Sequence, residues 1–189
     1  MSRDLYFIAI IPPQDICDEI TSFKMEIASD YDSHRALKVI PHITLKAPFK
    51  MPAAHHAGLF KWFSELYVNT GPFTIDLNNF GAFHNKNNPV IFVHPVMNVQ
   101  LAAVQKEIIR SFHNHYPEIT IMDIEHKFTP HMTVAYRDLE FSRFQEAWKV
   151  YHDKEYKRTF TVIDFHLLQH DGVKWNIAET YGLSKNKKL

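Results

Sequence analysis

The chain has 189 residues, of which 46% are hydrophobic and 22% are charged, and this balance is typical of an ordered globular protein. Its 21 basic residues equal its 21 acidic residues in number. Proteins that grip long nucleic acids through many phosphates usually carry a basic excess, so the zero net charge argues against that mode of binding. It still permits a small anionic ligand held by a few local donors.

Cysteine usage and hydropathy indicate the compartment. Cys17 is the only cysteine, so no intramolecular disulfide can form, which fits a reducing environment. No apolar run approaches the ~20 residues that a membrane-spanning helix requires, and no cleavage site follows the short apolar run near the N-terminus. We therefore expect a cytoplasmic protein without membrane contact, folded over residues 1–189 as a single bilobal unit and monomeric.

The first half of the chain predicts alternating strands and helices. The run LYFIAIIP is continuously apolar and rich in aromatic and β-branched residues, as in a buried strand. After it, Ile16, Ile20, Phe23 and Ile27 recur at helical spacing and line one face. The expected elements are a strand at 5–12, a helix at 13–29, a strand at 38–49 and a helix at 55–69.

The second half repeats this alternation. Two strands at 73–83 and 90–96 flank a polar turn and predict a hairpin. The remaining elements are expected to be a helix at 99–116, a strand at 128–138, a helix at 141–153, and two closing strands around the Asp-Gly turn at 171–172. The order β-α-β-α-ββ-α-β-α-ββ predicts a mixed fold built from two related halves.

One short motif occurs in both halves at matching places. It is PHITL at 41–45 and PHMTV at 130–134, each on a predicted strand between two helices. Side chains alternate along a strand, so the His and Thr of each motif share one face while the apolar residues between and after them face a core. If the halves pack about a pseudo-twofold axis, two imidazole–hydroxyl pairs face one cleft.

This set of side chains suits acid–base chemistry on a phosphate. Histidine titrates near pH ~6.5, so one ring can accept a proton while the other donates one. Threonine hydroxyls can hydrogen-bond the non-bridging oxygens of a phosphate between them. Such a site needs no metal or other cofactor, and it fits phosphodiester cleavage or its reversal.

The paired motifs resemble those of the two-histidine (2H) phosphoesterase superfamily, which includes LigT-like 2′-5′ RNA ligases and cyclic phosphodiesterases. The resemblance implies an α+β, bilobal fold in which two antiparallel sheets with flanking helices are related by a pseudo-twofold axis. It implies a metal-independent active site in the groove between them. His42 and His131 would be acid and base, in an order that the sequence does not fix, and Thr44 and Thr133 would bind phosphate.

Two cations near the motifs are candidate substrate ligands. Unbroken alternation would place Lys46 and Arg137 on the histidine face, where they could neutralise or clamp a phosphate. The alternative for each is a solvated charge at a strand end. By the same count Tyr136 falls on the opposite face, in the core.

Other residues favour structural roles. The remaining histidines are scattered, without an H-E-x-x-H motif or cysteine companions, so no metal site is predicted. No phosphate-binding loop of the G-x-x-x-x-G-K-[ST] type is present, which argues against use of nucleoside triphosphates. Phe7, Phe80 and Phe83 could stack on a base, but we expect core packing for each.

The leading functional hypothesis is a phosphoesterase for RNA 2′,3′-cyclic ends, 2′-5′ linkages or small cyclic nucleotides, acting in RNA processing. The alternatives are a non-catalytic protein that binds nucleotides or RNA ends in the same cleft, and a protein-interaction scaffold. The expected partner is a small cyclic nucleotide or a short RNA end. Specificity is expected to lie in the loops at 50–58, 84–89 and 118–127.

Overall fold

The computed structural model of the chain describes residues 5–186, with side chains described through residue 184. The strands are β1 (Leu5–Ile10), β2 (Ile43–Lys50), β3 (Phe73–Phe83), β4 (Val90–Pro95), β5 (Met132–Ala135), β6 (Lys157–Val162), β7 (Asp164–His170) and β8 (Trp175–Gly182). The α-helices are α1 (Gln14–Tyr31), α2 (His56–Ser64), α3 (Val99–His115), α4 (Asp123–His126) and α5 (Phe141–Tyr151). Short 3-10 helices occupy η1 (Arg35–Lys38), η2 (Ala53–His55) and η3 (Leu183–Asn186).

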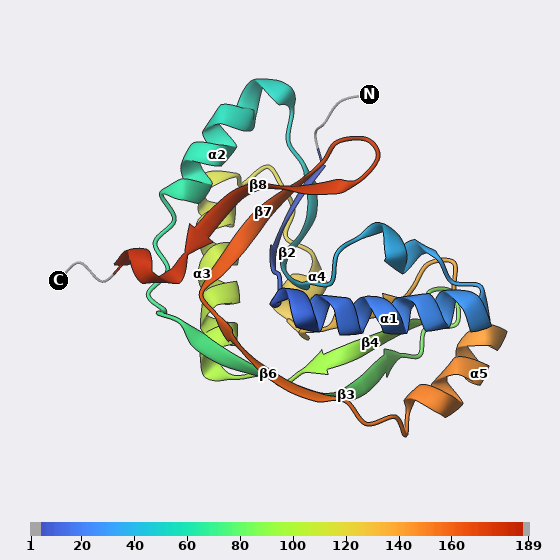
Figure 1. Cartoon of the computed structure of the whole chain (residues 1–189). Coiled ribbons are helices and arrows are strands. Elements are labelled where there is room, and N and C mark those ends of the chain that lie inside the picture. Colours follow the sequence, from blue (N-terminus) through green and yellow to red (C-terminus); the bar gives the residue numbers. More distant parts are fainter. Residues whose placement is uncertain (1–4, 187–189) are drawn as a thin grey trace.

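The strands form two four-stranded antiparallel sheets, one above the other in Figure 1. The first sheet has the order β2-β1-β7-β8 and the second has the order β5-β4-β3-β6. Both motif-bearing strands, β2 and β5, therefore lie at the edge of their own sheet. The predicted α+β, bilobal fold with two antiparallel sheets is confirmed.

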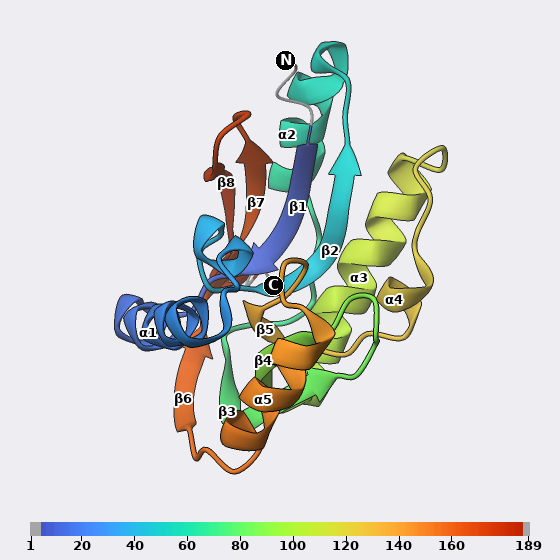
Figure 2. The ribbon, with the colours of Figure 1, turned by 90° about the vertical axis from the view of Figure 1, so that its right-hand side faces the viewer.

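The helices cross between the halves. Helix α1, from the first half of the chain, packs against β5 of the second sheet, and α3, from the second half, packs against β2 of the first sheet. Figure 2 shows α1 and α3 on opposite sides of the molecule. This reciprocal arrangement relates the two halves by a pseudo-twofold axis and holds the two sheets together around the main apolar core.

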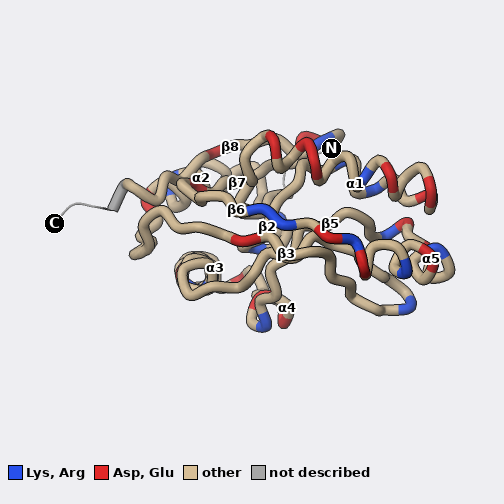
Figure 3. Tube along the Cα trace, turned by 60° about the horizontal axis from the view of Figure 1, so that its bottom comes forward, with Lys and Arg blue, Asp and Glu red and all other residues tan. Residues whose placement is uncertain are grey.

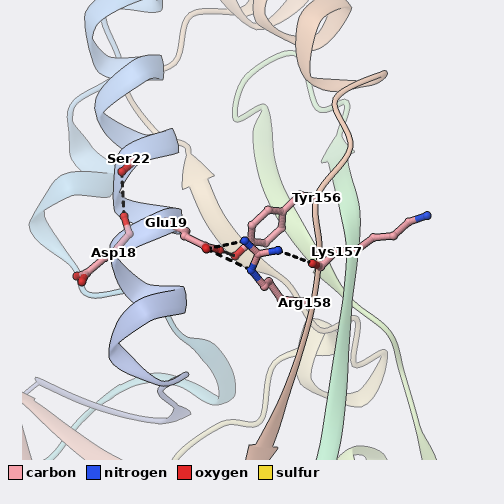
Figure 4. Close-up of polar contacts among 6 residues, drawn as sticks. All are labelled: Asp18, Glu19, Ser22, Tyr156, Lys157 and Arg158. Carbon is pink, nitrogen blue, oxygen red and sulfur yellow. Dashed lines mark hydrogen bonds and ion pairs between the residues drawn. The ribbon is translucent and has the colours of Figure 1, made fainter.

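Polar contacts fix α1 to the second sheet. The guanidinium of Arg158 on β6 donates to the carboxylate of Glu19 at 2.7 Å, and the Tyr156 hydroxyl donates to the same carboxylate at 2.7 Å (Figure 4). Two turns further along α1, Glu26 accepts two hydrogen bonds of 2.8 Å from the Lys154 ammonium. These contacts hold α1 against β6 and against the segment that precedes it.

The closing segment differs from the prediction. The expected strand before the Asp-Gly turn is divided at Ile163, which is 60% exposed, so that β6 joins the second sheet and β7 joins the first. Local pattern cannot show this division, because both pieces are extended and follow each other almost directly in the sequence. The β7–β8 hairpin is confirmed, and Gly172 adopts a φ of 101° in its turn.

Charge is dispersed over the fold. Figure 3 shows acidic and basic residues interspersed along the chain trace, in keeping with the zero net charge of the sequence. Within residues 5–186, none of the helices has the length and apolar character needed to cross a membrane.

Candidate active site

Both motif strands carry a β-bulge directly after the motif threonine. On β1 the consecutive residues Ala9 and Ile8 pair with Thr44 and Lys46, so Leu45 is the extra residue. On β4 the consecutive residues Phe92 and Ile91 pair with Thr133 and Ala135, so Val134 is the extra residue. Each bulge interrupts the alternation of side chains at the same place in its half.

The first bulge explains why Lys46 does not lie on the histidine face. Its partner Ile8 faces the core, so Lys46 faces the core too, where it is 1% exposed. Its ammonium lies 2.8 Å from the carboxylate of Glu125 on α4, which also accepts hydrogen bonds from the backbone N–H of Ala47 and Met122. The expectation that Lys46 reaches the substrate face is therefore wrong.

The two motifs converge on one cavity of about 370 Å³, which we call the motif cavity. His42, Thr44, His131 and Thr133 all line it, and each of these residues is half-buried. Thus the structure brings together the two imidazole–hydroxyl pairs that the sequence placed on separate strands. Within residues 5–184 no three His, Cys, Asp or Glu side chains cluster as ligands for a metal ion.

Both imidazoles are held in the same orientation. The Nδ1 atom of His42 lies 2.7 Å from the carbonyl oxygen of Ile40, and that of His131 lies 2.8 Å from the carbonyl oxygen of Thr129. A carbonyl oxygen only accepts, so each Nδ1 carries the proton and donates it. In the neutral ring, Nε2 then keeps its lone pair and is free to exchange protons with a ligand.

Burial lowers the pKa of both imidazoles. The pKa of His42 is lowered to about 4, chiefly by desolvation of the ring and also by the nearby positive charges of Lys24 and of protonated His131, against the opposing effect of its hydrogen bond to Ile40. Desolvation also lowers the pKa of His131, against the opposing effect of its hydrogen bond to Thr129. Both rings are therefore neutral at pH 7 in the free protein.

Aromatic rings support the imidazoles. The Phe7 ring centroid lies 4.9 Å from that of His42, and the Phe83 centroid lies 5.2 Å from that of His131. Phe7 and Phe80 are buried, as expected, and Phe7 also borders the motif cavity. Phe83 was expected in the core too, but its side chain is 36% exposed and lies beside His131. Tyr136 was expected in the core but borders the cavity, because β5 ends at Ala135 and alternation no longer applies.

Arg137 follows β5 and borders the cavity. It adopts a φ of 62°, inside a tight turn closed by a hydrogen bond of 2.8 Å from the Asp138 N–H to the Tyr136 carbonyl oxygen. The Asp138 carboxylate accepts hydrogen bonds from the Ser33 hydroxyl and from the backbone N–H of His34 and Arg35, at 2.9 to 3.0 Å. The segment before the first motif is thereby fixed to the turn after the second.

Sequence reasoning missed two parts of the cavity wall. Trp175 and His170, at the ends of β8 and β7, border it only because the closing hairpin belongs to the first sheet. Lys24 on α1 also borders it, and a signal for this residue was present: it follows Ile20 by four positions and precedes Ile27 by three. A charge on an apolar helical face suggests a functional role.

Comparison with known proteins identifies the class. The profile of the 2′-5′ RNA ligase superfamily matches residues 12–174. The chain belongs to the 2′-5′ RNA ligase superfamily.

Curated relatives and solved structures agree with this placement. A Bacillus cytotoxicus protein named "Putative phosphoesterase" is 31% identical over 184 residues, which cover 96% of this chain and 98% of that protein. A Geobacillus kaustophilus protein with the same description is 29% identical and covers 93% of this chain and 94% of its own length. TT0787 of Thermus thermophilus has the same fold, with a TM-score of 0.66 at 15% identity over 96% of this chain and 99% of its own. Escherichia coli LigT in complex with 3′-AMP has a TM-score of 0.59 at 15% identity, with the same coverage.

The buried pair of Lys46 and Glu125 predicts a large effect on stability. Replacing Lys46 by Met leaves the Glu125 carboxylate buried without its cation, and we expect the free energy of unfolding to fall by about 3–5 kcal/mol. Urea denaturation measures this change. Lys50→Met, on an exposed residue of the same strand, is the matched control and should change stability by less than about 0.5 kcal/mol. Equal stability of the two variants would contradict the account.

The lowered pKa of His42 predicts a specific titration. In an NMR titration of the free protein its ring should protonate at about pH 4, with His42→Asn identifying its resonances. The unfolded chain binds this proton near pH ~6.5, so the folded state loses stability as the pH falls from about 6.5 toward 4. Titration of the ring at or above pH 6.5 would show that the ring is not desolvated.

Proposed function

We propose that this protein is a metal-independent phosphoesterase that cleaves 2′,3′-cyclic phosphates or 2′-5′ phosphodiester linkages, and joins such ends in the reverse direction. The convergence of two imidazole–hydroxyl pairs on a single cavity carries the proposal. Membership of the superfamily and relatives named as phosphoesterases support it. The size of the cavity and the 3′-AMP bound to LigT support a nucleotide-sized ligand.

In this mechanism the two imidazoles divide the proton transfers. For a 2′,3′-cyclic phosphate, water attacks phosphorus while the neutral Nε2 of one ring accepts its proton. The bond from phosphorus to the 2′- or 3′-oxygen breaks, and the other ring, protonated at Nε2, donates its proton to that oxygen. The products are a phosphomonoester and a free hydroxyl group.

The threonines and Arg137 act on charge and position. Hydroxyl groups of Thr44 and Thr133 donate to non-bridging oxygens and hold phosphorus between the rings. The guanidinium of Arg137 contacts the same phosphate from the turn after β5. Lys46 has no part in substrate binding, because its charge is used by Glu125 in the core.

Loss of either histidine should remove most activity. We expect His42→Ala and His131→Ala each to lower kcat by about 10²–10⁴-fold on 2′,3′-cyclic nucleotides or a 2′-5′ dinucleotide, because each removes one proton-transfer group. His152→Ala, on an exposed residue directly after α5 and outside the predicted specificity loops, is the matched control and should retain wild-type activity. EDTA should have no effect.

Two outcomes would contradict the proposal. Robust turnover by the variant that lacks both imidazoles would exclude the acid–base mechanism. Saturable binding of nucleoside 2′- or 3′-phosphates by wild-type protein, with no turnover of any of these substrates, would favour a non-catalytic binding protein instead.

Ligand binding should be coupled to proton uptake. Both rings are neutral in the free protein, and a bound phosphate supplies negative charge that raises the pKa of the adjacent imidazoles. Isothermal titration calorimetry at pH 7 in buffers of different ionisation enthalpy should show uptake of up to one proton per bound nucleoside 3′-phosphate. His131→Ala should reduce this uptake, and equal heats in all buffers with the wild-type protein would contradict the assignment.

A further inference from the structure

Lys24 is a buried cation that none of the preceding steps uses. It lies on α1, its side chain is 2% exposed, and it borders the motif cavity. Its Nζ donates one hydrogen bond of 2.7 Å, to the carbonyl oxygen of Val39. An ammonium group has three N–H donors, and within residues 5–184 no carboxylate pairs with this one.

The surroundings of Lys24 leave its charge without compensation. Burial lowers the pKa of its ammonium to about 8, so it is still mostly charged at pH 7. The neighbouring Cys17 thiol provides no anion, because burial raises its pKa to about 11. A buried charge without a counter-ion is costly, and the cost falls when a ligand brings the missing negative charge.

We propose that the Lys24 ammonium contacts a non-bridging oxygen of the bound phosphate and acts as a third catalytic group beside the two histidines. This inference rests on the proposed function. Lys24 and Arg137 together place two fixed positive charges around the cavity, while both imidazoles of the free protein are neutral. A cyclic phosphodiester carries one negative charge, whereas the five-coordinate species formed by attack on it carries two.

The charge count therefore favours the transition state over the substrate. In the complex, Arg137 and the imidazole that takes up a proton already balance the single charge of the bound diester. Lys24 therefore gains most of its interaction energy as negative charge develops on the non-bridging oxygens. This gain stabilises the transition state and lowers the barrier to the chemical step. By the same count, the site should bind dianions more tightly than monoanions of similar size.

Sulfate binding tests the inference without requiring turnover, because sulfate stays a dianion from pH 5 to 10. Calorimetry at pH 7 should show at least about tenfold weaker sulfate binding in Lys24→Met, since a charge-assisted hydrogen bond is lost. Lys149→Met, which removes an exposed charge from α5, is the control for net charge and should change binding by less than about twofold.

The pH dependence separates a ligand contact from a structural one. The titratable and charged groups that line the cavity together with Lys24 are His42, His131, Tyr136, Arg137 and His170, and Cys17 neighbours Lys24 on α1. Near pH 8, His42 and His131 are already neutral and the guanidinium stays charged. Sulfate affinity of the wild type should therefore fall as the pH rises through about 8, and Lys24→Arg should keep its affinity to above pH 10.

Each result bears on the inference. The inference is overturned if Lys24→Met binds sulfate as tightly as the wild type. It is also overturned if the sulfate affinity of Lys24→Arg still declines near pH 8. Either result would leave Lys24 as an anchor for Val39. If Lys24→Met does not fold, the pH profile of Lys24→Arg decides alone. Lys24-dependent sulfate binding in a wild-type protein without turnover would refute the proposed function and keep Lys24 as an anion ligand.

Discussion

The convergence of two edge strands is the constraint on which the rest of the structure depends. Strands β2 and β5 belong to different sheets. The faces that carry their histidines and threonines meet because α1 packs on β5 and α3 packs on β2. Each bulge adds to this constraint, because it turns the residues after the motif threonine toward the core. The carboxylate of Asp138 then fixes the approach to the first motif against the turn after the second.

The electrostatics of the cavity follow from that packing. Desolvation keeps both imidazoles neutral, and a backbone carbonyl fixes the proton of each on Nδ1. Lys24 and Arg137 keep their charges beside them. The free site is therefore a partly desolvated cavity with positive charge and two neutral bases. It is complementary to a phosphate, whose negative charge raises the pKa of the rings.

Much of this could be predicted from the sequence, because strands, helices and motif faces depend on local periodicity. The faces of His42 and Thr44 follow from alternation over two residues, and the family follows from the repeat of their pattern. The position of Lys46 could not be predicted in this way, because the bulge at Leu45 depends on how β2 pairs with β1, which is far away in the sequence. Likewise the division at Ile163 depends on which sheet each half of an extended segment joins.

The most direct test of the central claim is a crystal structure of the protein with inorganic phosphate or vanadate bound. The account predicts a single anion in the motif cavity, with oxygen atoms within hydrogen-bonding distance of Nε2 of both His42 and His131 and of both motif hydroxyls. An anion that touches one ring alone, or that binds away from β2 and β5 altogether, would contradict it.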